Sequence, residues 1–175
     1  MLIGLFGITG NPPHLGHLTA IDEAAKIVDE VWVSPVYQHP FGKQPLAYNI
    51  RVMMTQLLLE NSNSNNVKLI EADKDYFLHF NKVPYSYDLL KWLSKQYPEH
   101  KFKLVIGEDN KKPEIWQKFY KYNEIDNEFG TCVLPDLGTH STKIREALKN
   151  NIIIDNALPE NITKYILTNN LYSEA

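Results

Sequence analysis

Residues 1–26 read MLIGLFGITGNPPHLGHLTAIDEAAK, and this stretch already indicates the fold class. The apolar run at 2–7 ends in turn residues, which is typical of a buried parallel strand. From Leu15 to Val28 the apolar residues recur at helical spacing. A strand, a glycine-containing turn and a helix therefore open the chain, as expected for the first unit of an alternating α/β fold.

The same alternation continues along the rest of the chain. Further strands are expected at 31–36, 67–72, 102–107 and 131–135, which are short apolar or β-branched runs. Helices are expected at 49–59, 85–97, 114–122, 141–149 and 158–169, the first of them with Asn49 as its N-cap. This order predicts an α/β fold with a doubly wound parallel sheet in three layers, α/β/α. We expect a single domain over residues 1–175, because no linker or repeat interrupts the pattern.

The composition narrows the class of protein. Hydrophobic residues make up 43% of the chain and charged residues 22%, and the formal net charge is −3, so we expect a soluble globular protein that binds neither nucleic acid nor a membrane surface. The single cysteine, Cys132, excludes an intramolecular disulfide and reads as a buried structural thiol. The first apolar run is too short for a membrane helix and lacks the basic start of a signal peptide, so we expect a cytoplasmic protein.

Four loops are expected at the edge of the sheet where such folds bind ligands. In doubly wound sheets, ligands bind outside the carboxyl ends of the strands, at the point where the strand order reverses. The loops at this edge would be 8–17, 36–47, 107–116 and 136–142, and they contain the unusual residues of the chain. A functional site is therefore predicted there.

The first of these loops carries the motif HLGH. Gly7 and Gly10 permit a tight turn and the close approach of a ligand, and Gly16 leaves room for a flat group. His14 and His17 are three residues apart, hence on one face of the start of a helix, where anions are favoured. They could be metal ligands, phosphate donors or ordinary surface residues. Zinc-binding pairs on helices usually stand four apart, so a phosphate role fits best.

The last loop carries a second motif, THSTKIR, at 139–145. Ser141 and Thr142 would begin a helix and present N–H and hydroxyl donors to a phosphate, and Arg145 would add a forked cation. Taken alone, the motif could equally be a helix N-cap followed by a solvated arginine. His140 could add a phosphate contact or simply end the loop.

Together, these motifs resemble a known superfamily. G-x-T-x-N-P-x-H-x-G-H after the first strand and THSTKIR after the last resemble the Rossmann-like nucleotidyltransferases, whose H-x-G-H signature binds the phosphates of ATP. VPYSYDLL at 83–90 and GEDNKKPEIWQKFYKYNEI at 107–125 resemble segments of the nicotinate and nicotinamide mononucleotide adenylyltransferases. The resemblance covers nearly the whole chain. It implies transfer of AMP from ATP to the mononucleotide, giving the pyridine dinucleotide and pyrophosphate in NAD biosynthesis.

The resemblance also implies a role for each motif residue. ATP would be bound by Gly7, Ile8, Thr9, His14, Gly16, His17, Gly107, Asp109, Ser141, Thr142 and Arg145. The mononucleotide would be bound by Lys43, Arg51, Ser86 and Trp116, with the Trp116 ring stacked on the pyridine. Catalysis would rest on His14, His17, Lys43 and Arg145. No protein metal site is expected, because Mg²⁺ would bind mainly through phosphates and water. Without the resemblance, the alternatives are a core aromatic, a surface charge and a helix N-cap for Trp116, Arg51 and Asp109, respectively.

Several residues depart from the family pattern, among them Asn11 in the first motif, an accepted variant, and Thr139 and His140 in the second. Gly10 stands where the family usually has phenylalanine and is expected to loosen the loop. Glu108 lies beside the proposed pyridine site and would disfavour nicotinate if its side chain pointed inward. Alternative functions are another nucleotidyltransferase, such as a pantetheine-phosphate adenylyltransferase or a cytidylyltransferase, and a non-catalytic nucleotide-binding protein. A homo-oligomer is compatible with the sequence.

Overall fold

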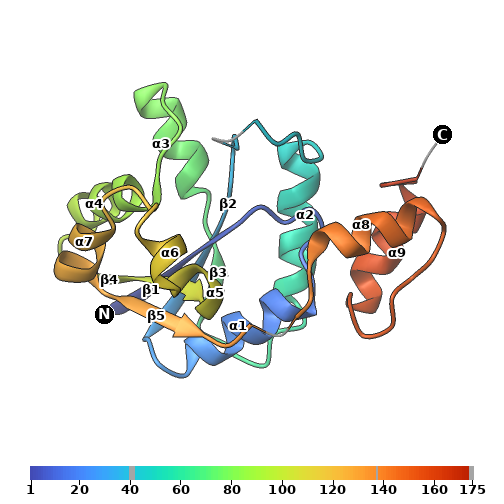
Figure 1. Ribbon diagram of the computed structural model, residues 1–175, viewed down its shortest axis with the longest axis horizontal. Helices are drawn as coiled ribbons and strands as arrows, with labels where there is room; N and C mark the ends of the chain where they lie inside the picture. The colour runs from blue at the N-terminus through green and yellow to red at the C-terminus, as the bar shows by residue number, and fades with distance from the viewer. Residues whose placement is uncertain (40–41, 137, 174–175) are drawn as a thin grey trace.

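The computed structural model describes residues 1–39, 42–136 and 138–173, and its centre is a five-stranded parallel sheet (Figure 1). The strands are β1 (Leu2–Ile8), β2 (Glu30–Pro35), β3 (Val67–Leu69), β4 (Lys101–Gly107) and β5 (Thr131–Leu134). Their spatial order is β3-β2-β1-β4-β5, so the direction of winding reverses between β1 and β4. Ile3 pairs with Glu30 on one side and with Phe102 on the other. The predicted doubly wound parallel sheet is confirmed.

Helices cover both faces of this sheet (Figure 1). One face carries α1 (Leu15–Ala25), α2 (Tyr48–Leu59), α8 (Ser141–Lys149) and α9 (Glu160–Thr168). The other carries α3 (Ala72–Phe80), α4 (Ser86–Gln96), α6 (Pro113–Trp116) and the π-helical segment η1 (Ile125–Phe129). The short α5 (Glu108–Lys111) and α7 (Tyr122–Glu124) connect these elements. None of the helices in the described ranges is long and apolar enough to cross a membrane.

Each face of the sheet has its own hydrophobic core. Ile3 and Leu5 of β1 pack into the core that contains Leu90 of α4. Phe6 and Ile8 of the same strand pack into the other core, under α1, α2, α8 and α9. A strand that is buried on both faces has few polar positions, which is why β1 could be recognised as a continuous apolar run.

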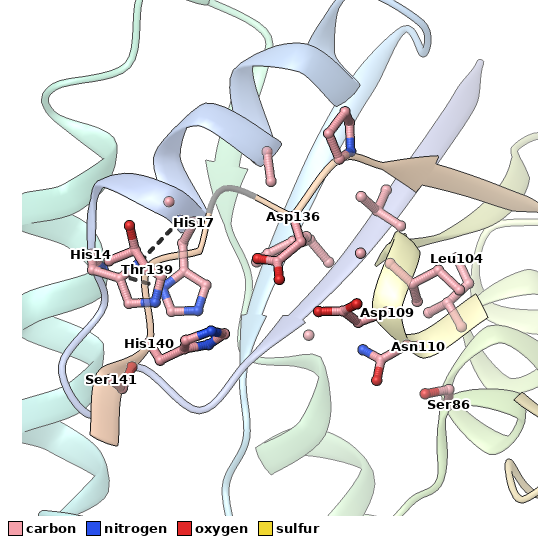
Figure 2. Close-up of a pocket in the computed structure, with 18 of the residues that line it drawn as sticks. His14, His17, Ser86, Leu104, Asp109, Asn110, Asp136, Thr139, His140 and Ser141 are labelled. Carbon is pink, nitrogen blue, oxygen red and sulfur yellow. Dashed lines mark hydrogen bonds between the residues drawn. The ribbon is translucent and has the colours of Figure 1, made fainter. Parts of the chain in front are cut away.

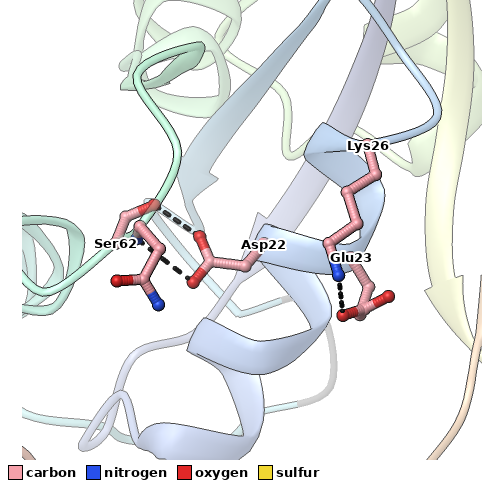
Figure 3. A network of polar contacts seen from close by, with 5 residues as sticks. Asp22, Glu23, Lys26 and Ser62 are labelled. Carbon is pink, nitrogen blue, oxygen red and sulfur yellow. Dashed lines mark hydrogen bonds and ion pairs between the residues drawn. The ribbon is translucent and has the colours of Figure 1, made fainter.

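The polar connector at 61–66 is attached to α1 (Figure 3). The Ser62 hydroxyl donates to the carboxylate of Asp22, and the Asn66 side chain donates to the carbonyl of Ala25 at 3.0 Å. The connector therefore closes the end of α1 and positions the strand that follows.

The structure contains the third predicted strand but ends it earlier than expected. The predicted strand at 67–72 ends at Leu69, and α3 follows from Ala72, where no helix was predicted. The buried residues of α3 are Ala72, Asp73 and Tyr76, whereas Leu78 is 63% exposed. The apolar residues of this segment are therefore not the ones that form its buried face. For this reason the spacing of apolar residues did not predict the helix.

Two helix boundaries also differ from the prediction. The helix α2 begins at Tyr48 after Ala47, and no side chain caps it, so Asn49 is not the N-cap. The helix predicted at 114–122 is broken, because Lys121 takes a left-handed φ of 54° before α7. This break allows the buried Trp116 to end α6 inside the core.

Candidate active site

Two adjoining cavities lie at the carboxyl ends of β1 and β4, where the winding reverses. The first, of about 530 Å³, lies over β4 and reaches α4 at Ser86 (Figure 2). The second, of about 640 Å³, lies over the loop after β1 and is bounded by Lys43 and Arg145. Four residues line both cavities and form what we call the junction: Gly7, His17, His140 and Ser141.

His14 and His17 form a reciprocal cap at the start of α1 (Figure 2). The backbone N–H of His17 donates to His14 Nδ1 at 3.3 Å, and the backbone N–H of His14 donates to His17 Nδ1 at 3.1 Å. The two rings are stacked, with centroids 3.6 Å apart. Because each Nδ1 is an acceptor, the proton of each neutral ring lies on Nε2. Each ring therefore keeps Nε2–H as its donor for a ligand.

Burial keeps this histidine pair uncharged. The pKa of His14 is lowered to about 4, first by burial and then by the charge of His140. The pKa of His17 is lowered to about 3, again by burial first and then by the charge of His14. Desolvation disfavours the charged form of an imidazole, and two stacked rings cannot both carry a charge at low cost. At neutral pH the pair therefore offers two uncharged N–H donors.

The histidine pair should make folding sensitive to acid. As the pH falls, an imidazole in the unfolded chain gains its proton near its ordinary pKa of 6.5. In the folded protein, His14 gains a proton only near pH 4 and His17 only near pH 3. The unfolded state then binds more protons, so we expect the free energy of unfolding to fall as the pH falls below about 6.5. Urea unfolding from neutral pH to about pH 5 measures this loss.

The control is the double variant His14→Asn, His17→Asn, in which the slope with pH should be smaller. Asp73 changes the free energy of unfolding in the opposite direction as the pH falls, because burial raises its pKa to about 6. Asp73 is present in both proteins, so its contribution cancels in the comparison. An unchanged slope in the double variant would mean that the histidines titrate normally.

Gly16 is required by the close approach of the His14 ring. A Cβ at this position would lie 2.9 Å from Cε1 and Nδ1 of His14 and 3.2 Å from Cβ of Thr139. The flat group for which Gly16 leaves room is thus the His14 imidazole. The H-x-G-H motif also brings the segment before α8 against the start of α1.

Gly10 is held in a tight turn. It is buried with φ +69°, and a Cβ there would lie 2.9 Å from Oγ1 of Thr55 on α2. A left-handed backbone packed this closely on a helix requires glycine. The expectation that Gly10 loosens the loop therefore does not match the structure, because the residue fixes the loop against α2.

We expect Gly10→Ala to destabilise the protein by about 1–3 kcal/mol, from backbone strain and the clash with Thr55. Urea unfolding at neutral pH measures this. Gly7→Ala is the matched control for stability, since a Cβ at Gly7 meets nothing within 4 Å. Equal losses of unfolding free energy in Gly10→Ala and Gly7→Ala would show that a side chain at Gly10 does not strain the turn.

The second motif is tied to the first loop by hydrogen bonds. Ser141 Oγ donates to the carbonyl of Pro12 at 2.9 Å. Arg145 donates through Nη1 to the carbonyl of Asn11 at 2.7 Å and through Nη2 to Thr142 Oγ1 at 3.2 Å. The second cavity is also lined by three predicted residues of the first loop: Gly7, Ile8 and Thr9. Two motifs that are far apart in the sequence thus meet at one cavity.

Asp109 lies on the first cavity, together with Gly107. Its carboxylate pairs with Lys112 at 2.9 Å and lies close to Asp136 (Figure 2). The pKa of Asp109 is lowered mainly by a side-chain hydrogen bond from Asp136 and next by Lys112. Asp109 is therefore an anion at neutral pH. It is not the N-cap of α5, since that position is taken by Gly107.

Lys43 and Ser86 were both predicted to bind the mononucleotide, but they line different cavities. Lys43 lines the second cavity and Ser86, the first residue of α4, lines the first. The structure therefore brings Ser86 together with Asp109 and places Lys43 near Arg145.

Arg51 lines neither cavity. It is only 2% exposed, and its guanidinium donates to the carbonyls of Leu46 at 2.8 Å, Thr9 at 2.8 Å and Val36 at 2.7 Å. The alternative of a surface charge is therefore wrong. Arg51 joins the loops after β1 and β2 to the segment before α2, and so shapes the second cavity from behind.

Trp116 also lies outside both cavity linings. It is 5% exposed, and its indole N–H donates to Asp126 at 2.8 Å. The ammonium of Lys111 lies 4.0 Å from the ring centroid. The aromatic side chain that lines the first cavity is Phe119, whose ring centroid is 4.9 Å from that of Trp116. In this conformation Trp116 is a core aromatic.

Several site residues were missed from the sequence. Asp136, Asn110 and Phe119 line the first cavity without having been assigned to the site, and so does His140, whose role the sequence left open. Tyr172 was missed as well, although its hydroxyl donates to Asn11 Oδ1 at 2.7 Å and so supports the first loop. Asn110, Asp136 and His140 lie in loops already expected at the site, whereas Phe119 lies in the segment predicted as a helix at 114–122. Tyr172 is 161 positions from its partner, and no local pattern signals such a contact.

Within the described ranges, no group of three or more His, Cys, Asp or Glu side chains is placed to hold a metal ion.

The chain is similar to known proteins along nearly its whole length. Residues 5–147 match the cytidylyltransferase-like family. The nicotinate-nucleotide adenylyltransferase of Bacillus subtilis (strain 168) is 31% identical, with 97% of each chain covered. A solved structure from Vibrio parahaemolyticus, assigned as a nicotinate-nucleotide adenylyltransferase, has a TM-score of 0.82 and 27% identity over 99% of this chain and 96% of that chain. The Plasmodium falciparum nicotinic acid mononucleotide adenylyltransferase complexed with NaAD has a TM-score of 0.80; at 16% identity over 98% of this chain and 97% of that chain, it supports the fold alone.

Proposed function

Since this chain belongs to the cytidylyltransferase-like family and, within it, to the nicotinate-nucleotide adenylyltransferases, we propose that it transfers the adenylyl group of ATP to nicotinate mononucleotide. The products are the pyridine dinucleotide and pyrophosphate. The observation that carries the proposal is the junction, where the neutral histidine pair of α1 meets the start of α8 between two cavities. A nucleotide spanning both cavities would place its phosphates there.

In the proposed reaction, a phosphate oxygen of the mononucleotide attacks the α-phosphorus of ATP. The bond from this phosphorus to the oxygen bridging to the β-phosphorus breaks, and pyrophosphate leaves with the electron pair. The attacking phosphate is already ionised at neutral pH, so no strong base is required. Catalysis is then the alignment of the two substrates and the stabilisation of charge on the phosphoryl oxygens.

The lining residues fit these two tasks. The Nε2–H groups of His14 and His17 would donate to the phosphoryl oxygens without carrying charge of their own. Thr142, Arg145 and Lys43, all on the second cavity, would hold the rest of the triphosphate. These side chains are N–H and O–H donors, which fit phosphate oxygens better than a bare cation. We therefore propose that Mg²⁺ arrives with ATP, held by phosphates and water.

The first cavity would receive the pyridine end at Ser86 and Phe119. Stacking of Trp116 on the pyridine stays part of the proposal and requires Lys111 to leave the face of the indole. Glu108 does not oppose a substrate carboxylate here, because its own carboxylate accepts the backbone N–H of Asp136 at 3.2 Å. This removes the reason to disfavour nicotinate. We place the reaction in the cytoplasm, as the sequence predicts.

The test is pyrophosphate release from ATP with a panel of acceptors: nicotinate mononucleotide, nicotinamide mononucleotide and phosphopantetheine. We expect release with the first, and a lower initial rate with the second. Release only with phosphopantetheine would point to a different nucleotidyltransferase. No release with any acceptor, in a protein that binds ATP in calorimetry, would point to a nucleotide-binding protein without catalysis.

A further inference from the structure

The side chain of His140 has no structural task in the described part of the chain. The residue occupies the N-cap position of α8, but its imidazole makes no capping hydrogen bond. Only the backbone carbonyl of His140 takes part in the first turn of the helix, where it accepts the N–H of Ile144 at 3.3 Å. The side chain is exposed and forms no other hydrogen bond or ion pair within residues 1–39, 42–136 and 138–173. Neither packing nor capping therefore explains a histidine here.

The position of His140 is nevertheless central. It lines both cavities and so belongs to the junction, together with His17 and Ser141. Figure 2 shows its ring beside the histidine pair of α1, on the side that faces the carboxylates of Asp109 and Asp136. A phosphate that reaches from one cavity to the other would pass next to this ring.

The four junction residues include no lysine or arginine. His14 and His17 are neutral, and each has one ring N–H to donate. Arg145 uses two of its five N–H groups on Asn11 and Thr142, and it lines only the second cavity. The exposed imidazole of His140 therefore adds a further N–H donor at the place where the two cavities meet.

Charged side chains surround His140 on both sides. Arg145 lies on the same helix and lines the second cavity together with Lys43. Asp109 of α5 and Asp136 after β5 line the first cavity. A phosphate at the junction would therefore find its cationic partners on the side of the second cavity, with His140 between the two cavities.

We propose that His140 is a third histidine donor to the nucleotide, and that it contacts the transferring phosphoryl group and the departing pyrophosphate at the junction. This proposal rests on the proposed adenylyl transfer. His140 forms no covalent bond in it. While the oxygen of the mononucleotide bonds to the α-phosphorus and the bond to the pyrophosphate oxygen breaks, the imidazole N–H donates a hydrogen bond to the oxygens that gain charge.

The experiment compares His140→Ser with His79→Ser, a substitution of an exposed histidine on α3 away from both cavities. Losing a hydrogen bond to a charged group should lower kcat/KM for ATP roughly 10- to 100-fold in His140→Ser. Inhibition by pyrophosphate should weaken by a similar factor, whereas KM for the mononucleotide should stay within about twofold. Thermal unfolding should be unchanged or slightly higher, because serine is a good N-cap. His140→Lys should recover part of the pyrophosphate inhibition, because it restores an N–H donor.

Two results would overturn the proposal. One is a His140→Ser protein with wild-type kcat/KM for ATP and wild-type inhibition by pyrophosphate, measured while the wild type makes dinucleotide. The other is found by calorimetry: equal ATP affinity in wild type and His140→Ser would reject the contact of His140 with phosphate. Calorimetry is needed if the wild type makes no dinucleotide with any acceptor. That outcome rejects the proposed function itself and leaves the contact of His140 to be tested separately.

Discussion

His17→Asn is expected to lower kcat roughly 100- to 1,000-fold while leaving the fold intact. The asparagine amide oxygen can take the place of His17 Nδ1 and accept the backbone N–H of His14, so the reciprocal cap survives. The variant has no group where Nε2–H donates, and the transferring phosphoryl group loses a preorganised donor. Steady-state pyrophosphate release measures kcat, and urea unfolding measures the fold.

The matched control is His17→Gln, whose amide N–H reaches towards the position of Nε2 but whose oxygen cannot cap His14. We expect this variant to keep more of kcat and to lose about 1 kcal/mol of unfolding free energy. Comparison of the two variants thus separates the contribution of the Nε2–H donor to kcat from the contribution of the cap to stability. Turnover close to wild type in His17→Asn would remove His17 from the catalytic group.

Arg51→Met is expected to lower the free energy of unfolding by about 3–5 kcal/mol, the largest effect on stability that we predict for a single substitution. The guanidinium donates to four carbonyls, of Thr9, Leu46 and the neighbouring Val36 and Tyr37, from a side chain that is 2% exposed. Methionine fills much of the volume but donates nothing, so these carbonyls lose their partners. Chemical denaturation at neutral pH measures the loss.

Lys118→Met is the control, because it removes an exposed cation and should change stability by less than about 0.5 kcal/mol. The comparison also tests the substrate role that the family resemblance implies for Arg51. If Arg51→Met kept nearly wild-type stability and only raised KM for the mononucleotide, the guanidinium would be a binding group rather than the residue that joins the loops after β1 and β2.

The sequence predicted the parts of the site that depend on local geometry. A buried strand followed by a turn and a helix places HLGH at the carboxyl end of β1, and the same reasoning places THSTKIR after β5. Parallel strands bring these ends to one edge, so the meeting of the two motifs follows from the alternation of strands and helices. The predicted lining residues from Gly7 to Arg145 are found there, apart from two.

The two exceptions, Arg51 and Trp116, show where such reasoning stops. Both residue types are equally suited to a ligand and to an interior partner. Arg51 is satisfied by carbonyls of two loops, and Trp116 by Asp126 and Lys111. Which partner a long or aromatic side chain takes depends on which groups the folded chain brings within reach, and no spacing in the sequence contains that information.

The alternation of strands and helices and the two cavity-forming motifs follow from local patterns, because hydrophobic period and turn residues act over short distances. The tautomers of His14 and His17, the packing that requires Gly10 and the inward turn of Trp116 follow from contacts between distant segments. The position of His140 between the cavities also follows from contacts between distant segments. A side chain acquires its charge state and its partners from burial and neighbours, and these exist only once the chain has folded.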